Sequence, residues 1–297
     1  MAQNLLIIPR VKIHNANALS SSYTIGFPAM TAWLGATHFL QRKLAGTDFS
    51  DIQFSAMAVS CHSMDLQTYK EQGGYVNSII GTGNPLDKNG NRPSFIEEAR
   101  CHLEISLVIE CENLGFIDRE EFTAFIDQLV KGKWKLAGGD ILSAGSSHLY
   151  EVNSQETFIK LRNRLMPGHC LVERRDLMMN AMQEEGLDAL DALLESQLLY
   201  SLCKQSEEGM VTWHKAKRKQ PGWIVPISVG YQGLTELGIA QHQRDPTTPH
   251  RFAENVVTLG EFKMPFRFQN WGEMRWQYHT DIEKNLYLCQ QAPLKNN

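Results

Sequence analysis

LLIIPRVKIHNANALSSSYTIGFPAMTAWLGATHFLQRKL, residues 5–44, sets the first strand and the first helix of the fold. Residues 5–13 predict a strand, in which an apolar stretch runs directly into Arg10 and Lys12. A Ser/Gly/Pro turn follows, and Pro28 fits the first turn of a helix that Gly46 can end. The residues that recur at helical spacing and would face the core are Met30, Trp33, Leu34, Thr37, Leu40 and Leu44. A more polar stripe lies beside them and consists of Thr31, Gly35, His38 and Arg42.

Further strands and a second helix extend this pattern. Residues 100–111, RCHLEISLVIEC, alternate apolar and polar residues, which is typical of a half-buried antiparallel strand with an open polar face. Residues 52–61 predict another strand, residues 119–130 an amphipathic helix, and WKLAGGDIL, residues 134–142, a short closing strand with a Gly-Gly turn. The order strand, helix, strand, strand, helix, strand is the ferredoxin-like βαββαβ order of RNA-recognition-motif (RRM) folds. We therefore predict an α+β fold, although this topology hosts many functions.

The remaining segments predict an arm and an extension. Residues 69–95, YKEQGGYVNSIIGTGNPLDKNGNRPSF, hold turn signals around short apolar pieces, so we expect an extended hairpin arm. Residues 155–203 have a strongly helical pattern. The predicted domains are residues 1–142, an RRM-like domain with its hairpin at about 70–95, and residues 143–297, a helical and short-strand extension packed on it.

The composition is that of an ordinary globular protein. Of the 297 residues, 42% are hydrophobic and 21% are charged. No apolar run reaches the ~18 residues of a membrane span, and the N-terminus lacks a signal-peptide pattern, so we expect no membrane association and a cytoplasmic location. The net charge of −4 argues against a stand-alone nucleic-acid-binding domain, which is usually basic overall. A subunit of a larger particle escapes this objection, because only its contact surface must be positive.

Motifs for metals and cofactors are absent from the sequence. The six cysteines are scattered without a CxxC pair, and the ten histidines include no HxH or HExxH, so we expect no metal site and mostly buried free thiols. Neither GxxxxGK[ST] nor GxGxxG occurs, and no GxSxG nucleophile elbow is found. The sequence therefore predicts no cofactor.

The polar end of the first strand carries groups that suit RNA. Cationic side chains position a sugar-phosphate chain, and amides and imidazoles can read base edges or the 2′-hydroxyl. Both kinds are supplied by Arg10, Lys12, His14, Asn15 and Asn17. The alternative interpretation is a strand whose polar end frays into a solvated loop.

Two later segments allow similar alternatives. The turn at Gly138 and Gly139 indicates close backbone approach, either to RNA or to a neighbouring strand, and the equally favoured alternative is that the glycines simply end a strand. The basic run 215–219 is typical of a solvated loop, but its neighbours Trp213 and Trp223 also suit contact with a nucleic-acid backbone.

Histidines raise the possibility of metal-free RNA cleavage, which needs a general base near a 2′-hydroxyl. The candidates are His14, His38, His62 and His102. His102 lies on the polar face of its strand and could meet His14 or His62 across the sheet. Histidines that contact RNA, or that are satisfied within the protein, are the favoured interpretation. The residues thus leave open an RNA binder, a ribonuclease and a plain scaffold.

A series of segments resembles one family. Besides the opening LLIIPRVKIHNANALSS and GFPAMTAWLGATHFLQRKL, they are, in order, CHSMD, GTGNPLDKNG, EEARCHLEISL, KLAGGDIL, RLMPGHCLVERRDL, QPGWIVPISVGYQGL and RFAENVVTLGEF. Together they cover nearly the whole chain and resemble the Cas-five-type subunit family, the second Csy proteins, of type I-F CRISPR surveillance complexes. The chain is shorter than the family pattern around residues 143–156 and 203–212, which puts contacts made there in doubt.

The resemblance implies a fold and a role. It implies an RRM-like RAMP domain with a thumb-like hairpin, in a subunit that binds the 5′ handle of the CRISPR RNA (crRNA). Such a subunit pairs with the large subunit at one end of the particle, and its thumb reaches toward the adjacent backbone subunit. Target DNA is met through the assembled complex. Precursor cleavage belongs to a different subunit, so the resemblance implies no catalytic residues here.

These observations predict a set of contact residues. The predicted RNA-binding residues are Arg10, Lys12, His14, Asn15, Asn17, Ser20, Arg42, Arg100, His102, Gly138, Gly139, Lys215, Lys217 and Arg218. The predicted thumb residues are Tyr75, Asn77, Asn84, Lys88 and Arg92. The main prediction is a non-catalytic handle-binding subunit. Its alternatives are a metal-independent CRISPR RNA-processing endoribonuclease of the same fold family and a protein-only scaffold.

Overall fold

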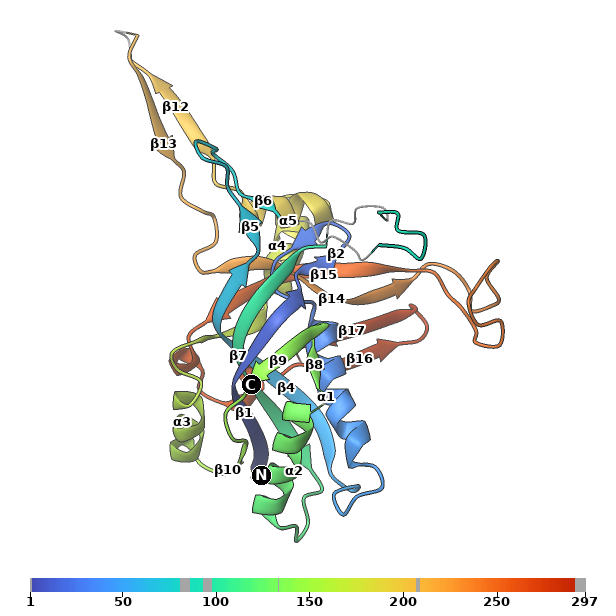
Figure 1. Ribbon diagram of the computed structural model, residues 1–297. Coiled ribbons are helices and arrows are strands. Elements are labelled where there is room, and N and C mark those ends of the chain that lie inside the picture. The colour runs from blue at the N-terminus through green and yellow to red at the C-terminus, as the bar shows by residue number, and fades with distance from the viewer. Residues whose placement is uncertain (1, 81–85, 93–97, 133, 207–208, 292–297) are drawn as a thin grey trace.

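The computed structural model describes residues 2–80, 86–92, 98–132, 134–206 and 209–291. One large antiparallel sheet dominates these residues, in the strand order β16-β17-β14-β15-β11-β4-β7-β1-β9-β8, with β10 also paired to β1. Figure 1 shows the sheet curling, so that β14 and β15 lie across the direction of β1 and β7. The fold is therefore α+β.

The strands fall into an N-terminal and a C-terminal group. The N-terminal strands of the large sheet are β1 (Gln3–Asn17), β4 (Gln53–Leu66), β7 (Arg100–Glu112), β8 (Lys135–Leu136) and β9 (Gly139–Ser143). The C-terminal strands are β10 (His148–Val152), β11 (His169–Glu173), β14 (Ile224–Gly233), β15 (Ala253–Lys263), β16 (Gln277–Asp281) and β17 (Leu286–Gln290). Small separate hairpins are formed by β2 (Leu19–Ser21) with β3 (Thr24–Ile25), β5 (Thr68–Tyr69) with β6 (Ser78–Ile79), and β12 (Ser201–Gln205) with β13 (Val211–Lys215).

The helices are short and lie around the sheet. They are α1 (Met30–Leu44), α2 (Arg119–Gly132), α3 (Gln155–Asn163), α4 (Arg175–Glu184) and α5 (Ala189–Gln197), with 3₁₀ turns at Pro265–Arg267 and Trp271–Glu273. Within the described residues, no helix has the length and apolar character needed to cross a bilayer.

The strands and helices predicted in the N-terminal half are found in the structure, together with the short extra strands β2, β3, β5 and β6. The strands predicted at 5–13 and 52–61 extend to become β1 and β4. Four of the expected strands are neighbours in the order β4-β7-β1-β9. The first helix begins at Met30, and Pro28 lies just before it, where its carbonyl accepts a hydrogen bond from Trp33 Nε1 at 3.1 Å.

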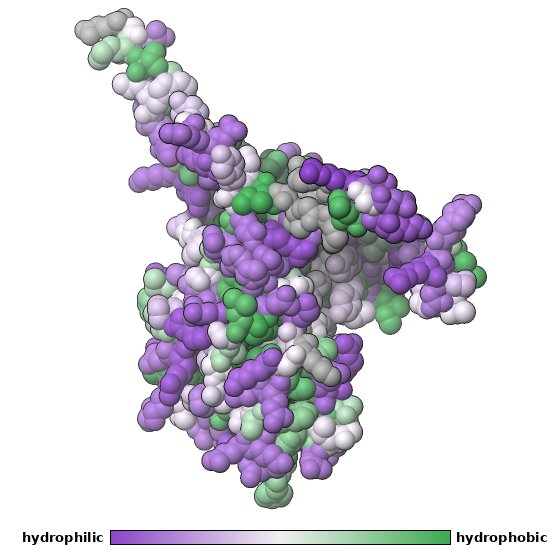
Figure 2. Space-filling view, viewed as in Figure 1, coloured by the Kyte–Doolittle hydropathy of each residue, from purple (hydrophilic) through white to green (hydrophobic). Residues whose placement is uncertain are grey.

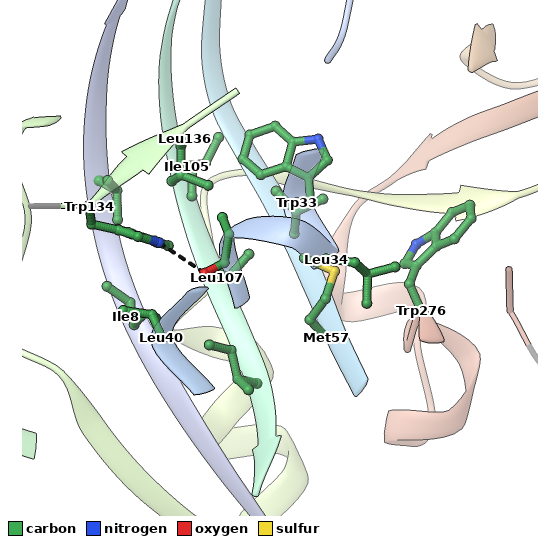
Figure 3. Packing of buried hydrophobic residues seen from close by; sticks show 14 of the residues in the cluster. Ile8, Trp33, Leu34, Leu40, Met57, Ile105, Leu107, Trp134, Leu136 and Trp276 are labelled. Atoms are coloured by element: carbon green, nitrogen blue, oxygen red, sulfur yellow. Dashed lines mark hydrogen bonds between the residues drawn. The ribbon is translucent and has the colours of Figure 1, made fainter. Parts of the chain in front are cut away.

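The main core lies between this sheet and the helices α1 and α2. Apolar residues of α1, such as Trp33 and Leu40, pack with Ile8 of β1 and with Phe122 of α2. Figure 3 shows part of this packing and the hydrogen bond from Trp134 Nε1 to the Ala36 carbonyl, 3.1 Å long. Both helices therefore cover the same face of the sheet.

The other face of the sheet is only partly open, which corrects the prediction of an open polar face on residues 100–111. At one end it is a second buried core, where Ile7 and Val108 pack with Phe158 of α3 and with Trp271. Trp271 Nε1 donates to the Glu110 carboxylate at 2.9 Å. Sequence alternation could not show this cover, because the covering segments lie far away in the chain.

The segment 155–203 is not continuously helical. Three short helices, α3 to α5, are interrupted by strand β11, and the segment ends in strand β12. Pro167 and Gly168 separate α3 from β11, and the apolar residues of β11 pair with β4 and β15. The large sheet thus continues across the predicted boundary at 142/143, and the division into two domains stays a prediction.

The hairpin predicted at about 70–95 is short where the structure describes it. β5 and β6 form a ladder of only two residue pairs, Thr68 with Ile79 and Tyr69 with Ser78. Among the described residues, the hairpin that projects as an arm is instead β12–β13 (Figure 1). We call β12–β13 the arm. β-prone residues such as Val211 and Trp213 support this ladder, whereas the glycine-rich segment after Tyr69 favours turns.

Candidate nucleic-acid interface

Two β-bulges in β1 determine where its polar side chains point. The pairing of β1 with β7 shifts register between Ile8 and Val11 and again between Ile13 and Ala16. Arg10 and Asn15 lie inside these shifts and have positive φ angles of 51° and 55°. Bulges re-aim side chains and bend a strand. The polar residues after Ile13 therefore gather at the end of β1, where β7 begins.

His14 and His102 form the centre of this end. Their rings stack with centroids 4.4 Å apart and planes inclined by 17°. The Asn15 backbone N–H donates to His102 Nδ1 at 3.2 Å. Gln67 Nε2 donates to Asn15 Oδ1 at 2.6 Å and lies 3.2 Å from His102 Nε2. The predicted meeting of His102 with His14 across the sheet is confirmed, and His62 lies elsewhere.

Arg100 lies beside this histidine pair. One guanidinium nitrogen is paired with the Glu98 carboxylate, and NH1 donates to the Asn15 carbonyl at 3.4 Å. The side-chain amide of Asn17 bonds to the backbone of Leu19. Its Oδ1 accepts from Leu19 N, and its Nδ2 donates to Leu19 O. The Arg100 guanidinium is therefore fixed in place by its two partners. The Asn17 side chain stabilises the backbone turn that follows β1.

A cleft of about 960 Å³ opens next to this end of β1, and we call it the β1–α1 cleft. Residues 17–22, α1 and the β8–β9 turn contribute to its walls. The predicted RNA-binding residues on its wall are Asn17, Ser20, Arg100 and Gly138. Figure 2 shows mainly hydrophilic residues over the neighbouring ends of β1 and β7. The structure thus brings separate parts of the predicted site together.

Cations and one acid border the β1–α1 cleft. Lys135 lines it and pairs with Asp140 at 2.8 Å, and the hydrogen bond from Lys135 holds the pKa of Asp140 below its usual value. Glu98 is the carboxylate on the same wall, opposite in charge to Arg100. The wall also carries the rings of Phe39 and Tyr231. Cations next to aromatic faces suit single-stranded nucleic acid.

Gly139 lies close to the backbone of β1, which is one of the alternatives for the Gly-Gly turn. A Cβ at Gly139 would lie 2.7 Å from the His14 carbonyl oxygen and 2.8 Å from Ala16 N, so the glycine allows β9 to approach β1. Gly139 is buried beside β1, and its contact with RNA stays a prediction. Gly138 is exposed, has a φ of +75° and lines the cleft.

Arg10 belongs to a different cluster. Its NH1 pairs with Glu104 at 3.2 Å, and its NH2 donates to the Met166 carbonyl at 3.1 Å. The Arg10 backbone N–H donates to Ser106 Oγ, which also contacts His62 Nε2 at 2.7 Å. Arg10 therefore links β1 to β7 and to the loop after α3, and it does not line the β1–α1 cleft.

Other predicted residues lie apart from the cleft. Lys12 is exposed on β1, opposite Glu104 in the register. Arg42 is exposed near the end of α1, about 18 Å along the helix axis from Met30. The predicted residues that are exposed on the arm or just after it are Lys215, Lys217 and Arg218. The structure does not bring these cations to the cleft.

The predicted thumb residues are exposed wherever they are described. These are Tyr75, Asn77, Lys88 and Arg92. Asn84 lies outside the described residues. None of the four lines the β1–α1 cleft.

Sequence reasoning missed several residues of the site. Gln67 and Lys135 were missed, although both carry polar side chains; Gln67 directly follows β4, and Lys135 begins β8. Tyr231 and Asn255 come from β14 and β15, and no local signal connects them to β1. In the described part of the chain, no cluster of histidine, cysteine and acidic residues suits a metal ion.

Comparisons with known proteins agree on one family. A family model described as "CRISPR-associated protein (Cas_Csy2)" matches residues 6–289. The CRISPR-associated protein Csy2 of Pseudomonas aeruginosa (strain UCBPP-PA14) is 31% identical over 315 aligned positions, which cover 95% of this chain and 94% of that protein. These matches confirm the resemblance to the second Csy proteins that the sequence motifs carried. The chain belongs to the Csy2 family of CRISPR-associated proteins.

Proposed function

We propose that this chain is a non-catalytic subunit of a type I-F CRISPR RNA-guided surveillance complex in the cytoplasm, where it binds the 5′ handle of the crRNA. One observation supports the proposal most directly. The stacked His14–His102 pair, Arg100 and the β1–α1 cleft lie together at one end of the sheet. These groups come from segments that are distant in the sequence. Family membership supports the CRISPR context.

The fold supports an RNA-binding role of the RRM-like, RAMP type. The strand order β4-β7-β1-β9, with α1 and α2 on one face, follows the βαββαβ arrangement predicted from the sequence. Single-stranded RNA is recognised by hydrogen bonds to splayed bases, by stacking and by cations that hold phosphates. The cleft and its border offer all three kinds of group.

The geometry of His102 supports binding without catalysis. A general base needs a ring nitrogen within hydrogen-bond reach of the 2′-hydroxyl. Nδ1 of His102 already accepts the Asn15 N–H, and Nε2 lies 3.2 Å from the Gln67 amide. Both ring nitrogens therefore face protein groups, which suits a histidine that organises the site.

The proposal includes protein partners. We propose that the chain pairs with the large subunit as a heterodimer that caps the particle, and that β5–β6 and its neighbours reach toward the adjacent backbone subunit. The chain then takes part in target DNA recognition through the assembled complex. A protein-only scaffold is the alternative that lacks any RNA contact of its own.

Arg100 gives the first test. Replacing Arg100 by Ala removes a cation that borders the cleft, so handle RNA should bind the full-length protein roughly tenfold more weakly. The matched control is Arg119→Ala, which removes an arginine that is also ion-paired, with Glu151 at 3.3 Å, but on α2. The measurement is fluorescence anisotropy with labelled handle RNA.

Experiments with the protein, its variants and RNA also distinguish handle binding from ribonuclease activity and from a protein-only scaffold. Equal affinities for wild type, Arg100→Ala and Arg119→Ala would contradict handle binding at this cleft. Specific cleavage of precursor RNA in EDTA, lost in His14→Ala or His102→Ala, would instead establish the ribonuclease. Absence of any crosslink between the handle and residues 10–42 in the assembled particle would favour the scaffold.

A further inference from the structure

Two cavities meet at Tyr231 on β14. On one side Tyr231 lines the β1–α1 cleft of about 960 Å³. On the other side it lines a second cavity of about 300 Å³, together with Arg251 and Asn285. Tyr231 is 43% exposed, so its aromatic ring is accessible and borders both cavities.

An incompletely bonded amide lies across the strand pair from this ring. Asn255 is opposite Tyr231 in the register of β14 and β15, and it lines the β1–α1 cleft. Its Oδ1 is buried and has no hydrogen-bond partner among the described residues. A buried amide oxygen without a partner costs free energy. Rotation of the amide exchanges its donor and acceptor, so Asn255 can offer either one to a ligand in the cleft.

An arginine is held in the second cavity. Arg251 NH1 donates to Asn285 Oδ1 at 2.5 Å, while its Nε is buried without a partner among the described residues. Gly233 makes room for the side chain, since a Cβ there would lie 2.6 Å from Arg251 Cδ. Asp281 lines the same cavity, but it pairs with Lys284 at 3.4 Å. In the described part of the chain, Arg251 forms no ion pair.

We propose that Tyr231, Asn255 and Arg251 form a subsite for one unstacked nucleotide of the bound RNA. The base stacks on Tyr231, its edge meets the Asn255 amide, and a phosphate next to it reaches Arg251. An aromatic ring, an amide and a guanidinium on neighbouring strands match the three parts of a single-stranded nucleotide. The subsite rests on the RNA binding proposed above and adds the C-terminal strands to the contact surface.

A coupling experiment tests this subsite. Handle RNAs that carry one abasic position each are titrated against the full-length protein and against Tyr231→Ala. We expect one abasic position to weaken binding to the wild type by about tenfold, and Tyr231→Ala to weaken binding of the intact RNA by a similar factor. Combining the two should cause no further loss. Tyr231→Phe keeps the ring and should bind as the wild type does.

Controls separate this subsite from the function on which it rests. Phe116→Ala removes a fully exposed ring that lines neither cavity and should leave RNA affinity unchanged. Thermal unfolding of each variant confirms that it is folded. If Arg100→Ala weakens binding but no abasic position couples to Tyr231, the subsite is refuted and the proposed function stands. If Tyr231→Ala weakens only association with the large subunit, the surface is a protein interface and the subsite is also refuted.

Discussion

His62 joins three segments that are distant in the sequence. Its Nδ1 lies 2.5 Å from the Pro167 carbonyl and its Nε2 lies 2.7 Å from Ser106 Oγ. A carbonyl only accepts, so Nδ1 carries the proton and Nε2 accepts from the Ser106 hydroxyl. Burial lowers the pKa of His62, and the Arg10 guanidinium lowers it further, while the Pro167 carbonyl and Glu104 oppose the change. The neutral imidazole is therefore the folded form.

The lowered pKa sets the sign of a pH effect. Because the folded pKa lies below the unfolded value of about 6.5, the stability that neutral His62 provides is complete above that value and is lost as the pH falls. His62→Gln should lower the free energy of unfolding by about 1–2 kcal/mol near pH 7.5, and by less near pH 5.5. Urea unfolding at the two pH values measures the difference.

The control for His62 is another histidine. His38 is exposed on α1, and His38→Gln removes no hydrogen bond among the described residues. It should change the free energy of unfolding by less than about 0.5 kcal/mol at both pH values. An equal loss for His62→Gln at both pH values would show that protonation of His62 is not linked to folding.

At the scale of elements, the arm and the segment after it carry exposed cations. The side chains of β12 and β13 are exposed along both strands. Lys219 differs from its neighbours, because it pairs with Glu185 at 2.8 Å and with Glu195 at 3.0 Å. Hydrogen bonds to these carboxylates raise the pKa of Lys219.

Salt dependence tests whether this segment touches RNA. Each phosphate contact on a single strand adds about 0.7 to the slope of log affinity against log salt. If Lys215, Lys217 and Arg218 all contact phosphates, changing the three to Gln should reduce the slope by about 2. Anisotropy titrations between about 50 and 200 mM salt measure this slope.

Lys219→Gln is the matched control. Its charge is already neutralised by two carboxylates, so the slope should not change. An unchanged slope in the triple variant as well would show that the basic run is a solvated loop, the alternative that the sequence left open.

At the scale of the whole molecule, both halves of the chain contribute strands to the large sheet and apolar residues to the main core. β11 pairs with β4, and β10 pairs with β1. Met57 of β4 exchanges backbone hydrogen bonds of 2.9 and 2.6 Å with Trp276. The Trp276 indole donates to the Leu171 carbonyl at 2.8 Å. Residues 143–297 are therefore needed to cover one face of the N-terminal strands.

This continuity predicts how fragments behave. Residues 1–142 expressed alone should show no cooperative unfolding transition, because apolar side chains such as Leu5, Ile7 and Val108 lose their cover. The full chain should unfold in one transition. A chain whose residues 201–215 are replaced by a short linker is the control, and it should keep that transition, since the arm is exposed. A cooperative transition in the 1–142 fragment would establish the predicted two domains.

The local pattern of the N-terminal half could be predicted from the amino-acid sequence alone. Strand β7 was identified by the alternation in residues 100–111, and helix α1 by the helical spacing from Met30 to Leu44. Both patterns arise because a strand or helix that is buried on one face has apolar residues at regular intervals. The same alternation placed His102 on the polar face, so its meeting with His14 could be predicted. The sequence motifs also indicated the family to which the chain belongs.

The partners of those elements, in contrast, depend on how distant segments pack in the folded chain. Whether Gly139 faces RNA or β1, and whether Arg10 is free or held by Glu104, depends on partners from other strands. Tyr231 and Asn255 reach the β1–α1 cleft because the C-terminal strands extend the sheet of the N-terminal half. Periodicity records which face of a segment is buried, but the pairing of distant strands is set by long-range burial and register, which leave no local signal.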